Sequence, residues 1–397
     1  MKSNRPRRLT AFQSLMRGWA ELAPYNFIHA LRFEEPAEQE RWRDATAETL
    51  HLLGLEASAL AIERPTVEID VHLEAELNRG FAAADLPLRF FLIETEDGGH
   101  WFGVVLDHFL ADDFSARALL RGIYARYRGT DLPEHMARAG KQPPSCGWFT
   151  EWRSFWQQAR ALRRAGRRPL RNPLDLTVGL FHSELPLGTL EAVRVLAKQQ
   201  NATVHDVFLA ATAQACGAAQ TGPAGARRDS VGLATAMDLR RFSDGADRAS
   251  FGLLITQYAV VEPHPEKIPL PELIARIAQQ TRTLKAMSGR AAFIAGLGFW
   301  RLARSRRAKA TLFQRGAPFA AGVSNVNLSG SWIEQSGVAE FRRVGPTGPV
   351  VPILLMITTF HGRLFLDTTY RTTAFTRPEA EQLVADFARG LAGEICS

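Results

Sequence analysis

The chain has only three cysteines in 397 residues, at positions 146, 216 and 396. They are scattered, odd in number and without C-x-x-C spacing, so neither a disulfide framework nor a zinc site is predicted, and we expect reduced thiols and no metal. No apolar run approaches the roughly 20 residues that span a bilayer. The basic start, MKSNRPRRLTAF, is not followed by the apolar core of a signal peptide, so we expect a cytoplasmic protein.

Motifs of nucleic-acid-binding proteins are also missing, although the net charge is +7. Arginines gather in two places without zinc-finger spacing, heptads or an RNP-like motif, which makes nucleic acid the weakest partner. Such clusters attract an acidic carrier protein, a nucleotide-bearing cofactor or an acidic membrane surface, or they form a solvated helical face. The first arginine cluster is Arg160, Arg163, Arg164, Arg167, Arg168 and Arg171, and the second basic cluster is Arg301, Arg304, Arg306, Arg307 and Lys309.

The hydrophobic content of 46% is ample for sizeable cores, and the length suits one large domain or two ordinary ones. Residue patterns in the first third predict a mixed α/β unit. Strands are expected over 25–33, 67–71, 88–94 and 101–106, and a helix over 38–53.

The stretch WFGVVLDHFLADDFSARALLRGIYARY, residues 101–127, places His108 and Asp112 four residues apart where a strand ends. A histidine at a strand end has its backbone held by the sheet and its ring free to face a cleft. The alternative is a histidine hydrogen-bonded inside a loop. Apolar residues then recur every four positions, which predicts a packed helix that Asp113 or Ser115 caps.

Residues 129–175 are predicted to cross between two halves. The aromatic residues of this segment either pack as one amphipathic helix, which we favour, or line an acyl pocket. A helix over 291–310 is expected to pack in the core, with a membrane surface or an aliphatic substrate as alternatives. His205 is interpreted as a helix-start residue. Further strands are expected over 178–185, 230–241, 251–261, 320–328, 350–360 and 363–370, and further helices over 189–199, 201–219, 271–287 and after a capping box at 376–379.

The motif Asp107-His108-Phe109-Leu110-Ala111-Asp112-Asp113 resembles the H-H-x-x-x-D-G signature of the acyltransferase superfamily with the chloramphenicol-acetyltransferase fold. That superfamily includes condensation domains, wax-ester synthases and polyketide-associated acyltransferases. The first histidine is replaced by Asp107 and the glycine by Asp113. Later phrases resemble the superfamily in the same order: MDLRR with Arg240, FGLL with Leu253 in place of asparagine, and GVSN with Ser324. The D-F-G-W-G loop of the plant branch is absent.

The resemblance implies an α/β fold of two similar mixed-sheet subdomains with a tunnel between them. We expect an N-terminal subdomain over 1–128, a crossover over 129–175 and a C-terminal subdomain over 176–397. The resemblance also implies an acyltransferase in which His108 is the general base. Asp112 is then structural and pairs with Arg240, with Asp113 and Arg241 as the competing pair. Ser324 is the expected oxyanion donor, and Asn325 is a less favoured donor or a substrate-binding residue.

No permanently bound cofactor is expected, because the donor substrate is a thioester of coenzyme A or of an acyl carrier protein. The acceptor is a hydroxyl or an amine. Two alternatives stay open within the fold: an amide-forming condensation activity, and a non-catalytic member that binds carrier proteins. A basic nucleic-acid binder is a third.

Overall fold

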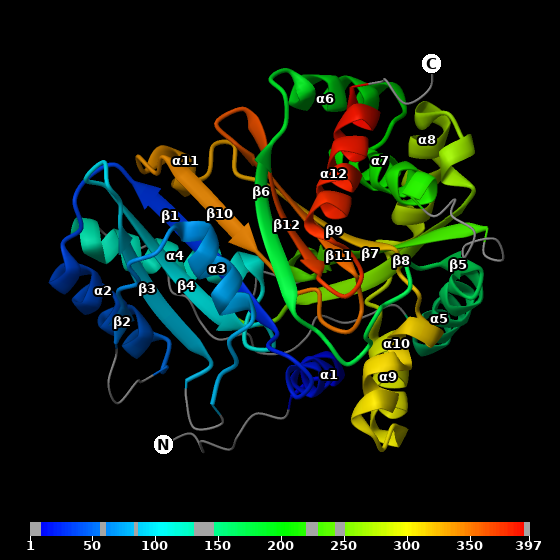
Figure 1. Cartoon of the computed structure of the whole chain (residues 1–397), viewed down its shortest axis with the longest axis horizontal. Helices are drawn as coiled ribbons and strands as arrows, with labels where there is room; N and C mark the ends of the chain where they lie inside the picture. The colour runs from blue at the N-terminus through cyan, green and yellow to red at the C-terminus, as the bar shows by residue number, and fades with distance from the viewer. Residues whose placement is uncertain are drawn as a thin grey trace.

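Two mixed β-sheets with helices around them make up the protein (Figure 1). The computed structural model describes residues 9–55, 61–82, 86–130, 147–219, 229–242 and 251–392, without the side chains at 241 and 314. Of the three cysteines, only Cys216 lies in these ranges, and it is a buried free thiol. Within the same ranges, no helix combines the length and the apolar character that crossing a membrane requires.

The first sheet has the strand order β10-β1-β4-β3-β2. Strands β1, β3 and β4 confirm the predictions over 25–33, 88–94 and 101–106. The strand predicted over 67–71 is wrong, because most of that segment begins helix α3, whose Leu73 and Leu77 pack against the sheet. The elements are β1 (Asn26–Phe33), α2 (Gln39–Leu52), β2 (Ile62–Glu63), α3 (Ile69–Leu77), β3 (Leu88–Glu94), β4 (His100–Asp107) and α4 (Asp113–Arg128).

Strand β10 (Glu340–Val344) joins this first sheet although it lies more than 200 residues beyond β4. It pairs antiparallel with β1, so that Ile28 is opposite Val344 and Arg32 is opposite Glu340. Figure 1 shows β10 in orange beside the blue strand β1. The sequence analysis did not expect this strand. Its charged sequence, EFRRV, lacks the apolar alternation by which the other strands were found.

The second sheet has seven strands in the order β5-β7-β9-β11-β12-β6, with β8 paired to β7. The strands predicted over 350–360 and 363–370 are confirmed and form a hairpin: β11 and β12 pair around His361 and Gly362, whose positive φ angles of 47° and 72° suit a tight turn. The strands are β5 (Ala165–Gly166), β6 (Val178–Glu184), β7 (Ser230–Asp238), β8 (Ile255–Pro263), β9 (Ala321–Asn327), β11 (Ile353–Phe360) and β12 (Arg363–Arg371).

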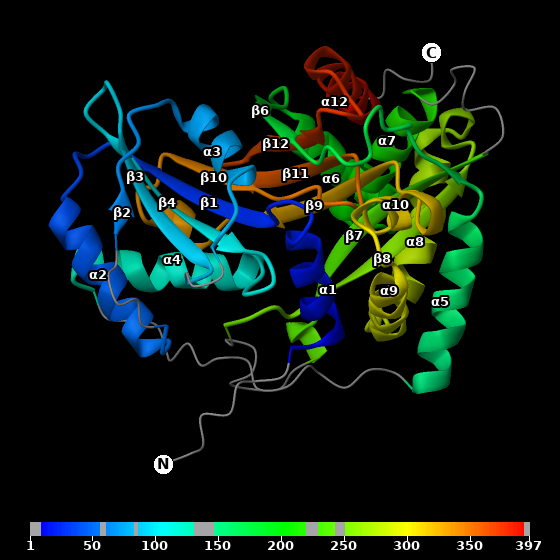
Figure 2. The same cartoon turned by 60° about the horizontal axis from the view of Figure 1, so that its bottom comes forward.

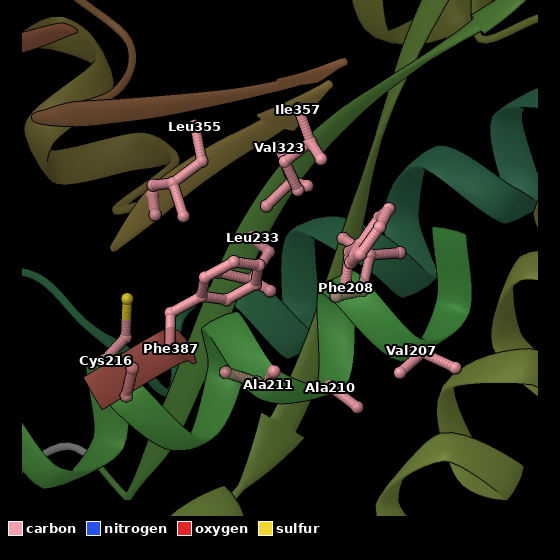
Figure 3. Packing of buried hydrophobic residues seen from close by; sticks show 14 of the residues in the cluster. Val207, Phe208, Ala210, Ala211, Cys216, Leu233, Val323, Leu355, Ile357 and Phe387 are labelled. Atoms are coloured by element: carbon pink, nitrogen blue, oxygen red, sulfur yellow. The ribbon is translucent and has the colours of Figure 1, made fainter. Parts of the chain in front are cut away.

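Helix α7 fills the core of the second half. It is alanine-rich, so it approaches the sheet closely, and Phe208 packs with Phe387 of α12 over Leu233 and Val323 (Figure 3). Thr203 and Asp206 form a capping box, because each residue's backbone N–H donates to the other's side chain. The helices around this sheet are α6 (Thr189–Gln199), α7 (Val204–Ala219), α8 (Leu270–Leu284) and α12 (Arg377–Leu391), while the short α11 (Trp332–Gln335) precedes β10.

Four further helices gather on one side of the second sheet, α1 (Ala11–Ala20), α5 (Trp148–Leu162), α9 (Arg290–Leu302) and α10 (Arg306–Gly316), as Figure 2 shows. The single helix predicted over 291–310 is wrong. The chain leaves the helical conformation at Ala303, and the Ser305 hydroxyl caps a new helix by accepting from the Ala308 N–H at 3.1 Å.

Candidate active site

His108 lies in the short loop between the end of β4 and the start of α4. Its backbone N–H donates to the Tyr25 carbonyl at 2.9 Å, which extends the pairing of β4 with β1 by one bond. The imidazole ring stacks against both Tyr25 and Phe27, with centroid distances of 5.7 and 5.0 Å. The sheet and the two aromatic rings therefore fix both the position and the plane of the imidazole.

Hydrogen bonding defines the tautomer of His108. Nδ1 lies 3.1 Å from the Ala111 carbonyl oxygen, which can only accept, so Nδ1 carries the proton and Nε2 keeps its lone pair. Burial lowers the pKa of His108 below the ordinary value of 6.5. The ring is thus neutral at pH 7 and has a basic nitrogen available.

A cavity of about 250 Å³ lies beside His108, where the two sheets meet. We call it the reaction cavity. The first sheet contributes Tyr25, Phe27 and Arg343, the start of α4 contributes Asp113 and Arg117, and β7, β8 and β9 contribute the far wall. Five site residues expected from the sequence line this cavity: His108, Asp112, Arg240, Ser324 and Asn325.

Asp112 and Arg240 form the expected ion pair. Arg240 Nη1 and Nη2 donate to the two carboxylate oxygens of Asp112 at 2.8 and 3.1 Å, and both residues are less than 5% exposed. The Asp112 carboxylate also accepts from the backbone N–H of Ser115 at 3.0 Å and of Leu254 at 2.7 Å. Asp112 is therefore the N-cap of α4, where Asp113 or Ser115 had been predicted.

The buried pair is completed by Ser115 and Gly252. The Ser115 hydroxyl donates to the Gly252 carbonyl at 2.8 Å and accepts from the Gly252 N–H at 3.0 Å, while Arg240 Nη2 donates to the same hydroxyl. Gly252 has a φ of 151°, a conformation that disfavours any residue with a Cβ. The FG phrase of the sequence thus forms the contact between the start of α4 and the second sheet.

The competing pair of Asp113 with Arg241 falls on a side chain that lies outside the described atoms. Within them, Asp113 pairs with Arg117 at 2.7 Å, with His29 Nε2 at 3.1 Å and with Arg343 at 3.5 Å. Burial works against the charge of this carboxylate, but the two arginines and the bond from His29 outweigh it and hold the pKa of Asp113 well below 3.8. The carboxylate that replaces the motif glycine is thus a charged part of the cavity wall.

Ser324 is held by an arginine that the sequence analysis missed. Arg343 of β10 donates through Nη1 to the Ser324 hydroxyl oxygen and through Nη2 to the Ser324 carbonyl, both at 3.0 Å. Because that hydroxyl oxygen accepts from a cation, its own proton is free to be donated into the cavity. Arg343 escaped prediction because its strand was not recognised.

Two further titratable residues singled out from the sequence, His205 and Asp107, form hydrogen bonds within the fold. His205 lies at the start of α7, as predicted, with Nε2 2.7 Å from the Thr235 hydroxyl, and burial lowers its pKa to about 4. Asp107, at the position of the first motif histidine, accepts from the Phe109 N–H at 3.4 Å, and burial raises its pKa to about 6.

The first arginine cluster divides in the structure. Arg168 pairs with Glu379, and Arg167 is largely buried, so that its pKa falls to about 9. The other four members are exposed, as are the four arginines of the second basic cluster. Arg160 on α5 and Arg301 on α9 belong to the two clusters, and these two helices pack together (Figure 2).

The aromatic residues of α5 do not pack fully against the body. Helix α5 is present and packs against α9 and β8, as favoured, but Trp148, Phe149 and Trp156 are 58%, 82% and 52% exposed. Phe155 and Trp156 instead line an apolar cavity beneath α5. The structure thus has both a helix that packs on the body and an apolar cavity beneath it.

Comparison with known proteins shows the fold. No family model and no curated protein sequence matches the chain. Among solved structures, it is similar to the trichothecene 15-O-acetyltransferase TRI3 of Fusarium sporotrichioides, with 11% identity, a TM-score of 0.72 and coverage of 98% of this chain and 95% of the other. It is also similar to the condensation domain of the monacolin K polyketide synthase MokA, with 12% identity, a TM-score of 0.68 and coverage of 97% and 96%.

A third similar structure is the SgcC5 protein of Streptomyces globisporus, with 13% identity, a TM-score of 0.67 and 98% of both chains covered. Each match extends over nearly the whole chain, so the likeness concerns both sheets and their connection. The expected fold is confirmed: the chain has the two-sheet α/β fold of condensation domains and related acetyltransferases.

Proposed function

We propose that this protein is an acyltransferase that moves an acyl group from a thioester to a hydroxyl or amine acceptor. The observation that carries the proposal is the state of His108: a neutral imidazole with its proton on Nδ1 and a basic Nε2, held at a cavity between two sheets. A general base for a neutral nucleophile needs this combination of protonation and placement.

The reaction follows from the residues in the cavity. His108 Nε2 takes the proton of the acceptor O–H or N–H while the acceptor oxygen or nitrogen bonds to the thioester carbonyl carbon. The resulting tetrahedral oxyanion then expels the thiolate, which takes the proton from the His108 imidazolium. No covalent intermediate with the protein is needed, and the histidine returns to its starting state.

Ser324 is the proposed oxyanion donor. Its hydroxyl oxygen already accepts from Arg343, so its proton is available to the developing negative charge, and the nearby cation favours that charge further. Asn325 lines the same cavity and is the second choice. Arg343 is a positioning residue, because it acts through Ser324.

The donor is proposed to be either an acyl-coenzyme A or an acyl group on an acidic carrier protein. The exposed arginines near α5 and α9 support an anionic partner of this kind. An acidic membrane surface is the alternative anionic partner, and exposed Trp148 and Phe149 on α5 support it.

The decisive experiment compares His108→Ala with the wild type in transfer from acyl thioesters to a panel of hydroxyl and amine acceptors. Removal of a general base typically lowers the rate about 10²- to 10⁴-fold. His51→Ala, on an exposed face of α2, is the matched control and should keep full activity. An unchanged rate for His108→Ala would disprove the assignment. Absence of transfer by the folded wild type with all donors and acceptors would favour a non-catalytic carrier-binding protein.

A further inference from the structure

A second cavity, of about 660 Å³, lies beneath the four helices α1, α5, α9 and α10. We call it the apolar cavity. Its volume falls within the range of roughly 300 to 1,000 Å³ that is usual for small-ligand sites. Its wall is largely aromatic and aliphatic, and includes Leu15, Trp19, Phe155, Phe293, Leu312 and Phe319.

A polar side chain that α5 contributes to this wall, Gln158, is already hydrogen-bonded within the fold. The Gln158 side-chain oxygen accepts from the Ala259 N–H at 3.0 Å, and its amide nitrogen donates to Ser154 at 3.1 Å. Arg163 and Arg315 line the cavity, but both are exposed and therefore lie at its rim. The interior offers mainly apolar contacts, so its complementary ligand is apolar.

The apolar cavity adjoins the reaction cavity. Three residues line both cavities: Ala234 of β7, Gln257 of β8, and Val350, which precedes β11. At these positions the wall between the two cavities is therefore one side chain thick. The smallest of the three is Ala234. At the opposite side, the partly exposed rings of Trp156 and Phe299 form an apolar rim. A ligand chain that passes this shared wall from the reaction cavity would enter an apolar space.

We propose that the apolar cavity binds the hydrocarbon chain of the acyl donor, so that the enzyme prefers long-chain acyl thioesters. This inference rests on the proposed acyl transfer. The acyl chain is favoured over an apolar acceptor because the chain must continue from the carbonyl carbon into the protein. An acceptor need only present its hydroxyl or amine to His108, and a polar thioester carrier has no complement in this wall.

Gly296 on α9 provides a way to fill the cavity. It lines the cavity, and a Cβ added there would lie 3.2 Å from Leu15 Cδ2, so the rest of a larger side chain must extend into the free space. Gly298, two residues further along the same helix, is exposed, and a Cβ there meets nothing within 4 Å. Gly296→Leu and Gly298→Leu are therefore a matched pair that differs in the face of the helix.

The test measures binding without chemistry. S-alkyl pantetheine thioethers resemble acyl donors but lack the carbonyl, so they cannot be turned over, and calorimetry gives their affinity for the full chain. Each methylene that enters the cavity should tighten binding about fourfold. Gly296→Leu should abolish this gain for tetradecyl compared with octyl chains, whereas Gly298→Leu should keep it. Affinity independent of chain length, or equal effects of the two variants, would overturn the proposal.

Turnover separates this proposal from the proposed function. With acetyl, octanoyl and myristoyl thioesters, the ratio of myristoyl to acetyl transfer should fall at least tenfold in Gly296→Leu and stay unchanged in Gly298→Leu. If the enzyme prefers acetyl donors, or if its rate depends on the length of the acceptor instead, the apolar cavity does not bind the acyl chain. The proposed acyltransferase activity would be unaffected by that result. Length-dependent thioether binding without any transfer would refute the acyltransferase and leave the cavity as a lipid-binding site.

Discussion

The pair Asp112 and Arg240 gives the sharpest stability prediction, because it joins the loop that carries His108 to the second sheet. We consider Asp112→Ala, Arg240→Ala and the double variant. In the wild type the carboxylate has four donors, namely two arginine nitrogens and the backbone N–H groups of Ser115 and Leu254. Both side chains are almost completely buried.

Removal of one partner leaves the other charge buried without compensation, which costs about 3 to 5 kcal/mol. Asp112→Ala also removes the cap of α4, worth about 1 kcal/mol, so it should be the more destabilising single change. The double variant leaves neither charge behind. It should therefore cost at least about 2 kcal/mol less than the sum of the two single variants.

The assay is urea unfolding followed by tryptophan fluorescence and circular dichroism, with coincident transitions required before free energies are compared. The exposed pair Glu272 and Arg276 on α8 is the control, and its coupling should stay below about 0.5 kcal/mol. Additive losses of unfolding free energy in the Asp112 and Arg240 variants would refute the reasoning. They would mean that removing either charge does not leave the other buried without a partner.

Four further predictions concern the site and its surroundings. The acidic limb of the pH–rate profile should lie below pH 6.5, because burial lowers the pKa of His108 and the neutral base persists as the pH falls; a limb above 6.5 would contradict this. Ser324→Ala should reduce kcat about 10²-fold with little change in KM, and Arg343→Gln should have a smaller effect that vanishes in the Ser324→Ala background. If the exposed arginines dock an acidic carrier, transfer from a carrier-bound donor should fall steeply with salt while transfer from a pantetheine thioester hardly changes, and equal salt dependence would exclude docking. Asp367 is buried, but its contacts with Arg342 and His182 outweigh burial and lower its pKa to about 2. Its contribution to stability is therefore present above about pH 4 and is lost as the pH falls towards 2. Asp367→Asn should flatten the pH dependence of the urea midpoint in that range.

Much of the fold was predictable because most strands and helices carry their own local signal. The hairpin around His361 has its turn residues, and α12 has its capping box of Thr376 and Glu379. The failures have physical reasons. Segment 67–71 alternates like a strand but lies mostly in a helix whose position is decided by packing on the first sheet, and a single serine at 305 divides the long helix.

The site was predictable to the extent that its residues belong to the motif phrases. The loop position of His108 and the pairing of Asp112 with Arg240 follow from those phrases and are present in the structure. Arg343 contacts Ser324, and the Leu254 N–H contacts Asp112, only because segments that are distant in the sequence pack together. No local pattern in the sequence distinguishes a backbone N–H such as that of Leu254 from any other.

The pairing of β10 with β1 bears on how the chain is made. During synthesis, every strand of the first sheet except β10 leaves the ribosome early, and β1 then has an unpaired edge of residues that are buried in the folded protein and mostly apolar. An open edge of this kind invites association with other chains until the last strand arrives. A fragment that ends before residue 340 should therefore aggregate, whereas addition of the distal segment should rescue it. Nascent chains of this protein would accordingly depend on chaperones for most of their translation.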